Sequence, residues 1–527
     1  MALTKATYSM ISTAPINVCD YGAVGDGTTN DTVAIQAAIS ALTSNQRLVF
    51  PGKNYLMGQV IFDGLSNISI DCQGAKFTLT GDNAGFVVKG ICNGIRVNGG
   101  DIIGDGTNRD ADPTKAQVGW LIGSYAGAYV QSVVIENVNV TSTNNGFKFA
   151  YGTGTGAGNA NYMRVSNCRA KNIVGTVGGV GYGFQFSQAN YSVITNCIAD
   201  NCGRHGIYFA EGYNYAASDC SIANHRLDVH SGTYRHGFEI SRSRNVSVTG
   251  CTFYNCFDGA MGINVDAQGV SPDNVCNTVA VSGCSFWGSD VADIRIGTLS
   301  PSTDGVVNNV LITGCVMNRI TTNGNQSIVL ESGNEVSIEN CQINGTNAAS
   351  ARAVVLNARE GATYTTYAQI SGNTIINYDT GIQIESALCT GTSTVRLMDN
   401  VILNSTTELE FLSGEDSITN NNLIYSRTNQ TNSTKSYTSS GSNVVIPAGG
   451  CDLLTISASG ATTVQTFSGG TIGQVLKLFF GNGNTTLTNN ASYLRLAGAT
   501  NFVGTANDTL TLVYVNGAWC EVSRSVN

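Results

Sequence analysis

The chain has 527 residues, of which 62 are glycine and only 12% are charged, where about 25% is typical of globular proteins. Its net charge of -9 lacks the basic footprint that nucleic-acid binding requires, so we expect no nucleic acid as a partner. No apolar stretch approaches the roughly 20 residues that cross a bilayer, and the first residues lack the apolar core of a secretion signal. We therefore expect neither membrane insertion nor secretion by that route.

The first predicted element is a helix within a module that spans residues 16–58. Asn30 or Asp31 can cap this helix, whose expected apolar face comprises Val33, Ile35, Ala38, Ile39 and Leu42. The preceding segment GDGTT, residues 25–29, lacks the regular acidic spacing of a calcium loop and is interpreted as a turn. We expect the helix to cover the end of the repeat fold that follows, whose edge strands are otherwise unpaired.

Short strands in a repeating pattern fill residues 59–426. Segments of the form small, apolar, any, apolar recur from GWLI at 119 to ELEF at 408, in ten steps of about 29 residues. A second strand that ends in a turn follows each of them, as in ITNCIA and VTGCTF. Alternating apolar residues without helical periodicity predict strands, and a period of this length predicts a solenoid. The predicted fold class is all-β, a right-handed parallel β-helix of at least eleven coils.

The cysteines follow the same repeat. Seven of the 16 occupy one repeat position, and three asparagines continue it: Cys168, Cys197, Cys220, Cys251, Cys284, Cys315, Cys341, Asn373, Asn400 and Asn421. Equivalent residues of successive coils stack at about 4.8 Å, and free cysteine packs as a small apolar residue. We therefore predict a buried ladder of free thiols rather than disulfides or a zinc site, because no Cys-x-x-Cys pair accompanies it.

Polar side chains gather at the outward positions of a few neighbouring coils. With the first residue of each repeat strand as position zero, positions one and three are apolar, so positions two and four are expected to face solvent. Position two holds Tyr208, Glu239, Asn264 and Arg295. On this alignment Glu239 and Asp266 lie one coil and two residues apart, which places their Cα atoms roughly 8 Å apart. That separation suits paired carboxylates in glycoside hydrolysis, so both are candidate catalytic residues.

The tripeptide Arg-His-Gly occurs twice, with Arg204 and His205 in one copy and Arg235 and His236 in the other. Both copies hold the same repeat position, so the stacking of equivalent turns accounts for their spacing without any chemistry. Alternatively, the four side chains bind carboxylates of an acidic polysaccharide or supply a base for β-elimination. Both interpretations stay open at this point.

Other candidates rest on weaker signals. Glu211 and Asp228 are reserve catalytic carboxylates, although a single acidic residue is more often a solvated surface charge. Tyr208 and Trp287 are candidates for stacking on sugar rings, although scattered surface aromatics are common. Insertions at residues 151–162 and 266–275 follow outward strands and are expected to form one wall of a groove. No sequence pattern indicates a metal or a cofactor, and none is predicted.

The C-terminal part departs from the repeat. Residues 427–443 form a polar, low-complexity stretch that we interpret as a linker. Alternating apolar residues and the turn Asn516-Gly517 predict a small antiparallel β-sandwich over residues 444–527. Trimerisation and carbohydrate binding are both open as its role.

The opening motif DYGAVGDGTTNDTVAIQAAI resembles that of the pectate-lyase-like superfamily, as found in bacteriophage tailspikes and related glycan depolymerases. The likeness is specific over about 45 residues, and the coil pattern extends it to about residue 426. It implies a homotrimer, without cofactor, that binds bacterial surface polysaccharide and is attached to the phage tail or baseplate by residues 1–15. It further implies assembly in the host cytoplasm and a final location on the virion.

Three functions remain open from the sequence. The first is a tailspike that depolymerises capsule, O-antigen or exopolysaccharide by endo-glycosidic hydrolysis, which we favour because no acidic cluster indicates the calcium of pectate-type elimination. The second is a polysaccharide lyase that acts on uronic acids. The third is an adhesin or fibre that binds glycan and cleaves nothing.

Overall fold

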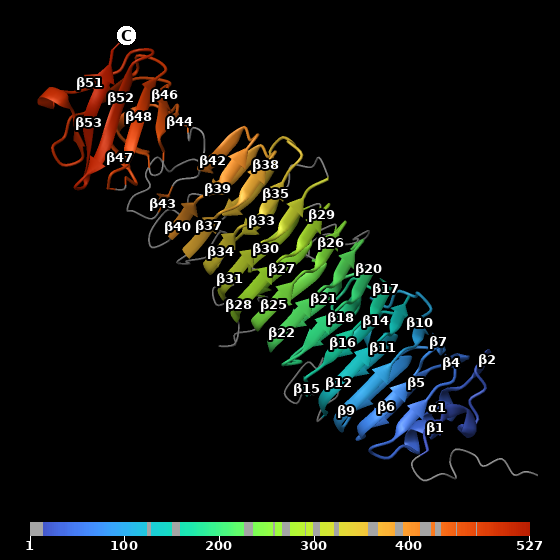
Figure 1. Cartoon of the computed structure of the whole chain (residues 1–527). Coiled ribbons are helices and arrows are strands. Elements are labelled where there is room, and N and C mark those ends of the chain that lie inside the picture. The colour runs from blue at the N-terminus through green and yellow to red at the C-terminus, as the bar shows by residue number, and fades with distance from the viewer. Residues whose placement is uncertain are drawn as a thin grey trace, which may run out of the picture. The chain divides into compact units, whose positions relative to one another are not determined.

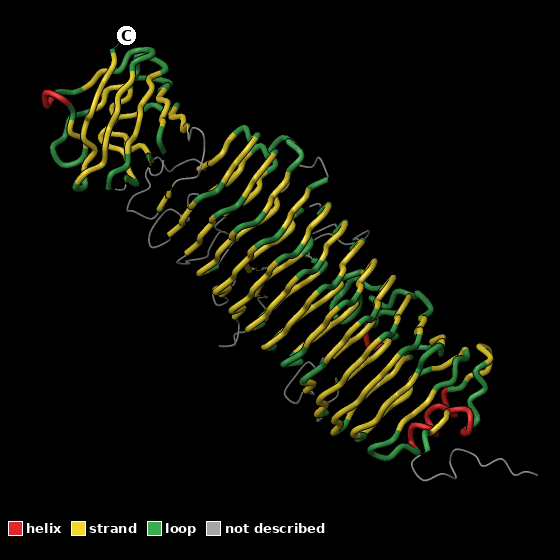
Figure 2. Tube along the Cα trace, in the orientation of Figure 1, coloured by secondary structure: helices red, strands yellow, loops and turns green. Residues whose placement is uncertain are grey.

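The computed structural model describes residues 14–526, except for 124–127, 150–158, 226–235, 257–258, 266–274, 290, 299–305, 321–325, 332, 357–366, 385–393, 412–422, 427–433, 449–450 and 471. The chain forms two compact units, of which the first comprises Met1–Leu311 and Cys315–Ile328 and the second comprises Ile312–Gly314 and Val329–Asn527. Both units contain three parallel sheets, and each coil adds one strand to every sheet (Figures 1 and 2). The predicted right-handed parallel β-helix is confirmed.

In the first unit, the strands of sheets A, B and C lie side by side in chain order. Sheet A contains β1 (Ile16–Asn17), β3 (Arg47–Val49), β6 (Ser66–Asp71), β9 (Ile91–Asn98), β12 (Tyr129–Glu136), β16 (Arg164–Ser166), β19 (Val193–Thr195), β22 (Tyr213–Ser218), β25 (Arg244–Thr249), β28 (Val275–Ser282) and β31 (Val306–Thr313), with β15 (Asn159–Asn161) beside β12. Sheet B contains β2 (Asp26–Asn30), β4 (Asn54–Met57), β7 (Lys76–Leu79), β10 (Asp101–Ile103), β13 (Asn139–Thr141), β17 (Arg169–Ile173), β20 (Ile198–Cys202), β23 (Ser221–Ala223), β26 (Thr252–Tyr254), β29 (Ser285–Trp287) and β32 (Val316–Asn318). Sheet C contains β5 (Gln59–Asp63), β8 (Gly85–Lys89), β11 (Val118–Ile122), β14 (Asn145–Phe149), β18 (Tyr182–Ser187), β21 (His205–Ala210), β24 (Phe238–Ser241), β27 (Met261–Val265), β30 (Ala292–Thr298) and β33 (Gln326–Leu330).

The coils of the second unit follow the same plan. Their strands are β34 (Asn334–Glu339), β37 (Tyr367–Ser371), β40 (Thr394–Met398) and β43 (Leu423–Ser426) in one sheet, β35 (Gln342–Asn344), β38 (Thr374–Ile376) and β41 (Val401–Leu403) in the next, and β36 (Arg352–Leu356), β39 (Thr380–Ile384) and β42 (Thr407–Phe411) in the third.

Close backbone approach explains the glycine at position zero of many sheet C strands. A Cβ on Gly119 would lie 2.6 Å from the carbonyl oxygen of Gly146, and a Cβ on Gly183 would lie 2.6 Å from that of Gly206. Ordinary contacts begin at 3.4 Å, so any side chain here would push neighbouring coils apart. The small residue in the repeat pattern is therefore a requirement of coil stacking.

The six repeat cysteines of the first unit, from Cys168 to Cys315, form the predicted single file. The residue that follows a cysteine donates its backbone N–H to the carbonyl of the cysteine one coil earlier, as from Ile198 to Cys168 at 2.9 Å and from Ser221 to Cys197 at 2.8 Å. In the second unit, Cys341, Asn373 and Asn400 stack in the same way. All seven cysteines are buried and none of them forms a disulfide, and both asparagines are buried, whereas Asn421 lies outside the described residues.

The predicted helix is α1 (Thr32–Ser40). Gln36 donates to the carbonyl of Ile61 at 3.0 Å and accepts from its N–H at 2.8 Å, so the helix supplies hydrogen bonds to the first strand of sheet C. Asp31 is the N-cap residue, but its carboxylate accepts from the backbone of residues 24 and 25 instead of capping the helix. The expectation that Val33 belongs to the buried face is wrong, because it is 82% exposed while Ile35 is fully buried.

The prediction of a turn at GDGTT is wrong in part, because Asp26–Asn30 is strand β2 and only its first residues make a local turn, which Asp26 closes. The carboxylate of Asp26 accepts hydrogen bonds from the N–H groups of Thr28 at 2.8 Å and Thr29 at 2.7 Å. These bonds lower the pKa of Asp26. Short 3-10 helices lie before this turn at Val18–Tyr21 and later at Pro113–Lys115 and Ala497–Ala499.

The C-terminal domain has two mixed sheets rather than antiparallel ones. One contains, in order, β44 (Thr434–Tyr437), β46 (Leu453–Ile456), β48 (Val475–Phe480), β52 (Thr509–Val515), β53 (Ala518–Ser525) and β50 (Leu494–Arg495), and the other contains β45 (Gly441–Pro447), β47 (Thr462–Ser468), β49 (Thr485–Leu487) and β51 (Phe502–Val503). From β44 to β49 successive strands alternate between the sheets, so neighbours in one sheet run parallel. The predicted hairpin at Asn516-Gly517 joins the antiparallel strands β52 and β53.

The two sheets of this domain share one apolar core, to which both contribute, as with Val464 and Leu478. Strand β44 lies within the stretch that we expected to be a linker. Among the described residues, no helix has the length and apolar character needed to cross a bilayer.

Candidate functional site

An outward row of side chains runs along sheet C of the first unit. Strand register pairs its members coil by coil, and from the N-terminal side they are Val87, Leu121, Lys148, Gln185, Tyr208, Glu239, Gly262 and Arg295. The row begins with two apolar residues, and from its third member on every residue except Gly262 is polar or ionisable. As predicted, Tyr208, Glu239 and Arg295 share one row, with Tyr208 and Glu239 in successive coils and Arg295 two coils beyond Glu239.

The predicted position of Asn264 in this row is wrong. Glu239 pairs with Gly262, and Asn264 pairs with Ser241, so the coil is shifted by two residues from the sequence alignment. A Cβ at position 262 would lie 2.5 Å from Oε2 of Glu239, so only glycine fits opposite the carboxylate. Asp266 is therefore four residues, not two, beyond the partner of Glu239, and the 8 Å estimate no longer holds. Asp266 itself lies outside the described residues.

Glu239 is the centre of a buried polar cluster. Nδ1 of His236 lies 2.5 Å from Oε2 of Glu239, and the side-chain amide of Asn264 donates to Oε1. With Glu239 ionised, Nδ1 is the donor, so the neutral imidazole of His236 keeps Nε2 as a proton acceptor. This arrangement can receive a proton at Nε2 and stabilise the resulting imidazolium by the carboxylate.

Burial of this cluster contradicts the expectation that positions two and four face solvent. Glu239 and Asn264 are each 3% exposed and His236 is 2% exposed. Part of the cover comes from the imidazole of His236, which directly precedes the strand and lies against Glu239 and Gly262. The alternation along a strand determines to which face of the sheet a side chain points, but not whether other residues bury it.

The first Arg-His-Gly copy has a different local role. Nδ1 of His205 donates to the backbone carbonyl of His236 at 2.8 Å, so this histidine joins two coils. Burial, and next the charge of Arg204, lower the pKa of His205 well below its ordinary value. The rings of Tyr208 and Tyr182 pack against His205, and Arg204 lies over Tyr182 at 5.4 Å. Stacking therefore accounts for His205, whereas His236 is paired with a carboxylate.

The remaining candidates lie apart from this cluster. Glu211 forms an ion pair with Arg242 and accepts from Gln188 at 2.9 Å, as expected for a surface carboxylate. Trp287 is 46% exposed but lies on sheet B, so the structure does not bring it to the row. Tyr208, expected to be exposed, is only partly so, because its ring stacks on His205.

Several predictions lie outside the described residues: Asp228, Arg235, residues 1–13, and most of the insertions at 151–162 and 266–275. In the part of the chain that the structure describes, no group of three or more His, Cys, Asp or Glu side chains is placed to hold a metal ion.

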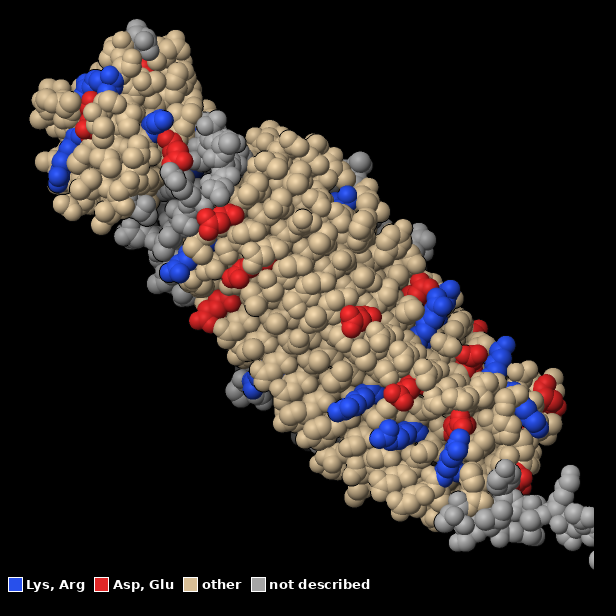
Figure 3. Space-filling view, in the orientation of Figure 1, with Lys and Arg blue, Asp and Glu red and all other residues tan. Residues whose placement is uncertain are grey.

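Lys148 and Gly262 are members of the row that the sequence reasoning missed. A signal for Lys148 was present, because GFKF at residues 146–149 carries a charge at position two. On the face drawn in Figure 3, charged side chains are sparse and acidic and basic ones lie interspersed. Lys148 is 8% exposed, and its ammonium donates to the carbonyl of Gly179 at 3.1 Å.

Comparison with known proteins supports the fold assignment. Residues 15–261 match the family model described as rhamnogalacturonase A/epimerase, pectate lyase-like. No curated protein sequence matches the chain. Among solved structures, the Agl-KA catalytic domain is 14% identical, with a TM-score of 0.52 over 76% of this chain and 69% of that one.

Two tailspikes are also similar in structure. The Dettilon tailspike protein is 17% identical, with a TM-score of 0.51 over 78% of this chain and 70% of that one. A mutant tailspike of Escherichia coli bacteriophage HK620, in complex with a pentasaccharide, is 12% identical, with a TM-score of 0.48 over 97% and 92% of the two chains. The family match over residues 15–261 and the three stacked parallel sheets together confirm the resemblance of the opening motif to pectate-lyase-like proteins and the right-handed parallel β-helix fold.

Proposed function

We propose that this protein is a tailspike that binds a bacterial surface polysaccharide and cleaves its internal glycosidic bonds by hydrolysis. The observation that carries the proposal is the buried carboxylate of Glu239, held by His236 and Asn264 in a row that also contains Tyr208 and Arg295. A row with one member per coil suits an extended chain molecule that lies along the solenoid. The similarity in fold to the Dettilon tailspike is consistent with this role.

In the hydrolytic mechanism, Glu239 instead carries the proton of its contact with His236 and donates it to the glycosidic oxygen, while a second carboxylate activates water. Glu211 lies one coil and three positions from Glu239, which places their Cα atoms roughly 11 Å apart. Carboxyl groups about 6.5–9.5 Å apart are typical of inverting enzymes. The two glutamate side chains are long enough to bring their carboxyl groups from a Cα separation of roughly 11 Å into this range. Glu211, Asp228 and Asp266 remain the candidates for the second carboxylate.

β-Elimination is the second candidate, and the orientation of His236 favours it. The contact with Glu239 leaves Nε2 as the proton acceptor, as abstraction of a sugar proton requires. Burial raises the pKa of Tyr208, which disfavours a phenolate base and leaves the imidazole as the better one. Arg295, two coils further along the row, can neutralise a uronate carboxylate.

The products distinguish the reactions. The wild-type protein is incubated with a panel of capsules, O-antigens and exopolysaccharides, and the fragments are analysed by mass spectrometry and ultraviolet absorbance. Hydrolysis adds one water per cleavage and creates reducing ends, whereas elimination leaves an unsaturated uronate that absorbs in the ultraviolet. Binding without any fragment identifies an adhesin and contradicts the proposed enzyme.

A matched pair of variants tests the role of Glu239. Glu239→Gln keeps the side-chain shape and is expected to lower activity about 100-fold or more, because it removes proton transfer. Glu136→Gln, at the exposed C-terminal end of strand β12 in sheet A, serves as the control and should leave activity unchanged. Full activity of Glu239→Gln would show that Glu239 is not catalytic.

The assembly that we propose is a homotrimer attached to a phage tail or baseplate through residues 1–15, assembled in the host cytoplasm and carried on the virion. Light scattering should give a mass about three times 55.1 kDa. We propose no cofactor, so chelators should leave the activity unchanged.

A further inference from the structure

Three exposed tyrosines form a strip beside the first residues of the sheet A strands β16, β19 and β22. The rings of Tyr162 and Tyr191 stack at a centroid distance of 5.0 Å, and the ring of Tyr213 meets that of Tyr191 edge to face at 5.2 Å. The three residues are 48%, 43% and 41% exposed. They come from three successive coils, so this tyrosine strip runs along the solenoid.

The backbone of two of these tyrosines is strained. Strand register places Tyr162 and Tyr191 in one row, and the other residues of this row between β6 and β28 are glycine or have short polar side chains: Asn67, Gly94, Ser132, Asn214, Asn245 and Thr278. The whole row has a left-handed backbone, with φ of 59° at Tyr162 and 57° at Tyr191. Glycine adopts this conformation freely and asparagine tolerates it, whereas a bulky side chain there is a clear exception.

The fold does not need aromatic residues at this position. Both tyrosines are largely exposed, and the row keeps the same backbone conformation with asparagine in the two coils that follow. Asn245 also donates to Asn214 at 3.1 Å, so asparagine supplies a hydrogen bond between coils. Strained residues that stability does not require are found at functional sites. The tyrosine strip therefore has the features of a binding surface.

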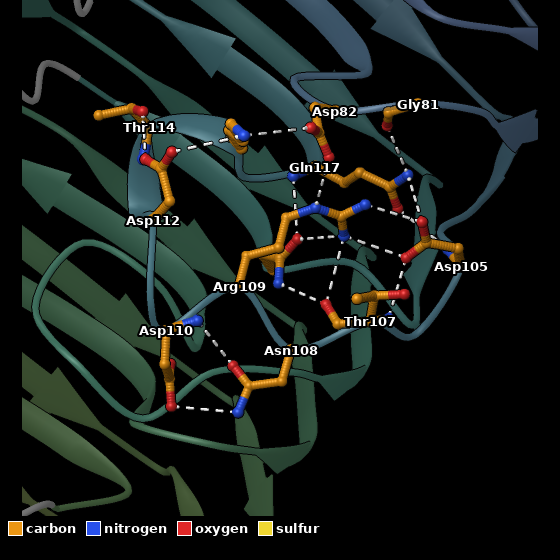
Figure 4. A network of polar contacts seen from close by, with 12 residues as sticks. Gly81, Asp82, Asp105, Thr107, Asn108, Arg109, Asp110, Asp112, Thr114 and Gln117 are labelled. Atoms are coloured by element: carbon orange, nitrogen blue, oxygen red, sulfur yellow. Dashed lines mark hydrogen bonds and ion pairs between the residues drawn. The ribbon is translucent and has the colours of Figure 1, made fainter.

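Exposure alone does not mark a binding surface, as the charged network around Arg109 illustrates. Arg109 donates to Asp105 at 2.8 Å and to Asp82 at 3.2 Å (Figure 4). Asp110 of the same segment accepts from the N–H of Thr176 at 2.7 Å, which ties two turns of the chain together. These exposed or half-buried side chains serve the fold through contacts within the chain. The tyrosine strip differs from them because its residues strain the backbone instead of joining segments.

The size and chemistry of the tyrosine strip fit a sugar chain. A tyrosine ring offers an apolar face for the C–H groups of a sugar and a hydroxyl group for its polar groups. At about 150–250 Å² per aromatic side chain, three rings that are less than half exposed offer no more than roughly 330 Å². A stable protein interface needs about 800 Å² on each partner, so a few sugar rings match the strip better than a protein does.

The position of the strip also suits the proposed ligand. The coils that carry Tyr191 and Tyr213 also carry Gln185 and Tyr208 of the outward row. Tyr213 is five residues beyond Tyr208, so their Cα atoms are at most roughly 17 Å apart. A polysaccharide that is bound along the row can therefore contact the tyrosine strip with residues outside the candidate site.

We propose that the tyrosine strip is a second glycan-binding site, at which neutral sugar rings of the polysaccharide pack against the tyrosine side chains. This inference rests on the glycan-binding part of the proposed function and adds a contact surface that lies beside sheet A. The strip holds the polymer and takes no part in the chemical step.

Asparagine substitution separates binding from folding, because asparagine occupies this row in other coils. The full chain and the double variant Tyr162→Asn/Tyr191→Asn are titrated by calorimetry with the capsules, O-antigens and exopolysaccharides of the panel described above. At least one polysaccharide should bind the wild type and bind the double variant about tenfold or more weakly. The urea midpoint of the double variant should be unchanged or higher, because the substitution removes backbone strain.

Two further variants serve as controls. Tyr191→Phe keeps the ring and should keep the affinity for the polysaccharide within about twofold. Tyr254→Asn removes a tyrosine that is 52% exposed at the end of strand β26 in sheet B, and it should bind like the wild type.

The outcomes separate the tyrosine strip from the proposed reaction. An unchanged affinity in the double variant overturns the strip, as does an equal loss in Tyr254→Asn or the absence of binding by the wild type across the panel. A lower urea midpoint would show that the rings serve the fold, and a changed mass in light scattering would show that they join copies of the chain; either result overturns it. Tyrosine-dependent binding without cleavage leaves the strip standing and refutes hydrolysis, whereas cleavage with unchanged binding in the double variant refutes the strip alone.

Discussion

Gly262→Ala should disrupt the His236–Glu239 pair without any direct change to either residue. A Cβ at position 262 would lie 2.6 Å from Cε1 of His236 and 2.5 Å from Oε2 of Glu239, whereas ordinary contacts begin at 3.4 Å. The imidazole must therefore move by at least 3.4 − 2.6 = 0.8 Å. Both groups are almost fully buried, so the neighbouring coils resist this displacement.

The expected cost combines two effects. Overpacking of a filled interior costs about 1–3 kcal/mol, and loss of a buried hydrogen bond to a charged group costs about 1.5–3 kcal/mol. Together they predict a decrease of about 2.5–6 kcal/mol in the free energy of unfolding. Urea unfolding followed by tryptophan fluorescence measures it, with Gly483→Ala as the control, because a Cβ at position 483 meets no atom within 4 Å.

A double-mutant cycle identifies the cause. If the clash is with the imidazole, alanine at position 262 should cost clearly less in the His236→Ala background, since the space is then free. The glycosidic activity should also fall in Gly262→Ala, by roughly the factor seen for Glu239→Gln. A variant as stable and as active as the wild type would refute the assigned register and the contact between the two side chains.

Three further predictions concern the solenoid. Asn373→Ala should lower the free energy of unfolding by about 1–3 kcal/mol, because the N–H of Cys341 loses its acceptor. Asn373→Cys should lower it less, because the new thiol extends the ladder. The urea midpoints of the two variants test this order. Among the described thiols, Cys19 and Cys520 should react first with a thiol reagent in the native protein, because the others are buried, and mass spectrometry of the labelled peptides checks the order. The free energy of unfolding should fall as the pH drops below about 6.5. The reason is that His205 then takes up a proton in the unfolded chain but not in the folded chain, where its pKa is lowered. Urea titrations of His205→Gln should show a weaker pH dependence.

The sequence was sufficient to predict the solenoid because its repeat is a local property. Alternating apolar residues, a small residue at position zero and the recurring cysteine each reflect contacts with equivalent residues one coil away. The thiol ladder illustrates this, since Cys168 and Cys197 stack as their spacing indicates. Helix α1 was also predicted, because its apolar periodicity does not depend on distant contacts.

The candidate site was predicted only in part. Glu239, Tyr208 and Arg295 share the expected row, but the Glu239 and Asp266 pairing rested on aligning Gly262 with Gly237. The coil instead places Gly262 opposite Glu239. The register places Ala260 opposite Gly237. Ala260 and Gly262 are both small residues near the start of one strand, and nothing local decides between the two registers.

What the sequence determined by itself is therefore the path of the chain, namely coils of short parallel strands with small residues and thiols at fixed places. Only the tertiary structure decided which side chains meet across coils and which are covered. The physical reason is that coil register depends on side-chain volume between coils, as His236 and Glu239 show by excluding any Cβ at position 262. In the same way, Lys148 is buried by segments that fold back over sheet C, a long-range contact that no repeat encodes.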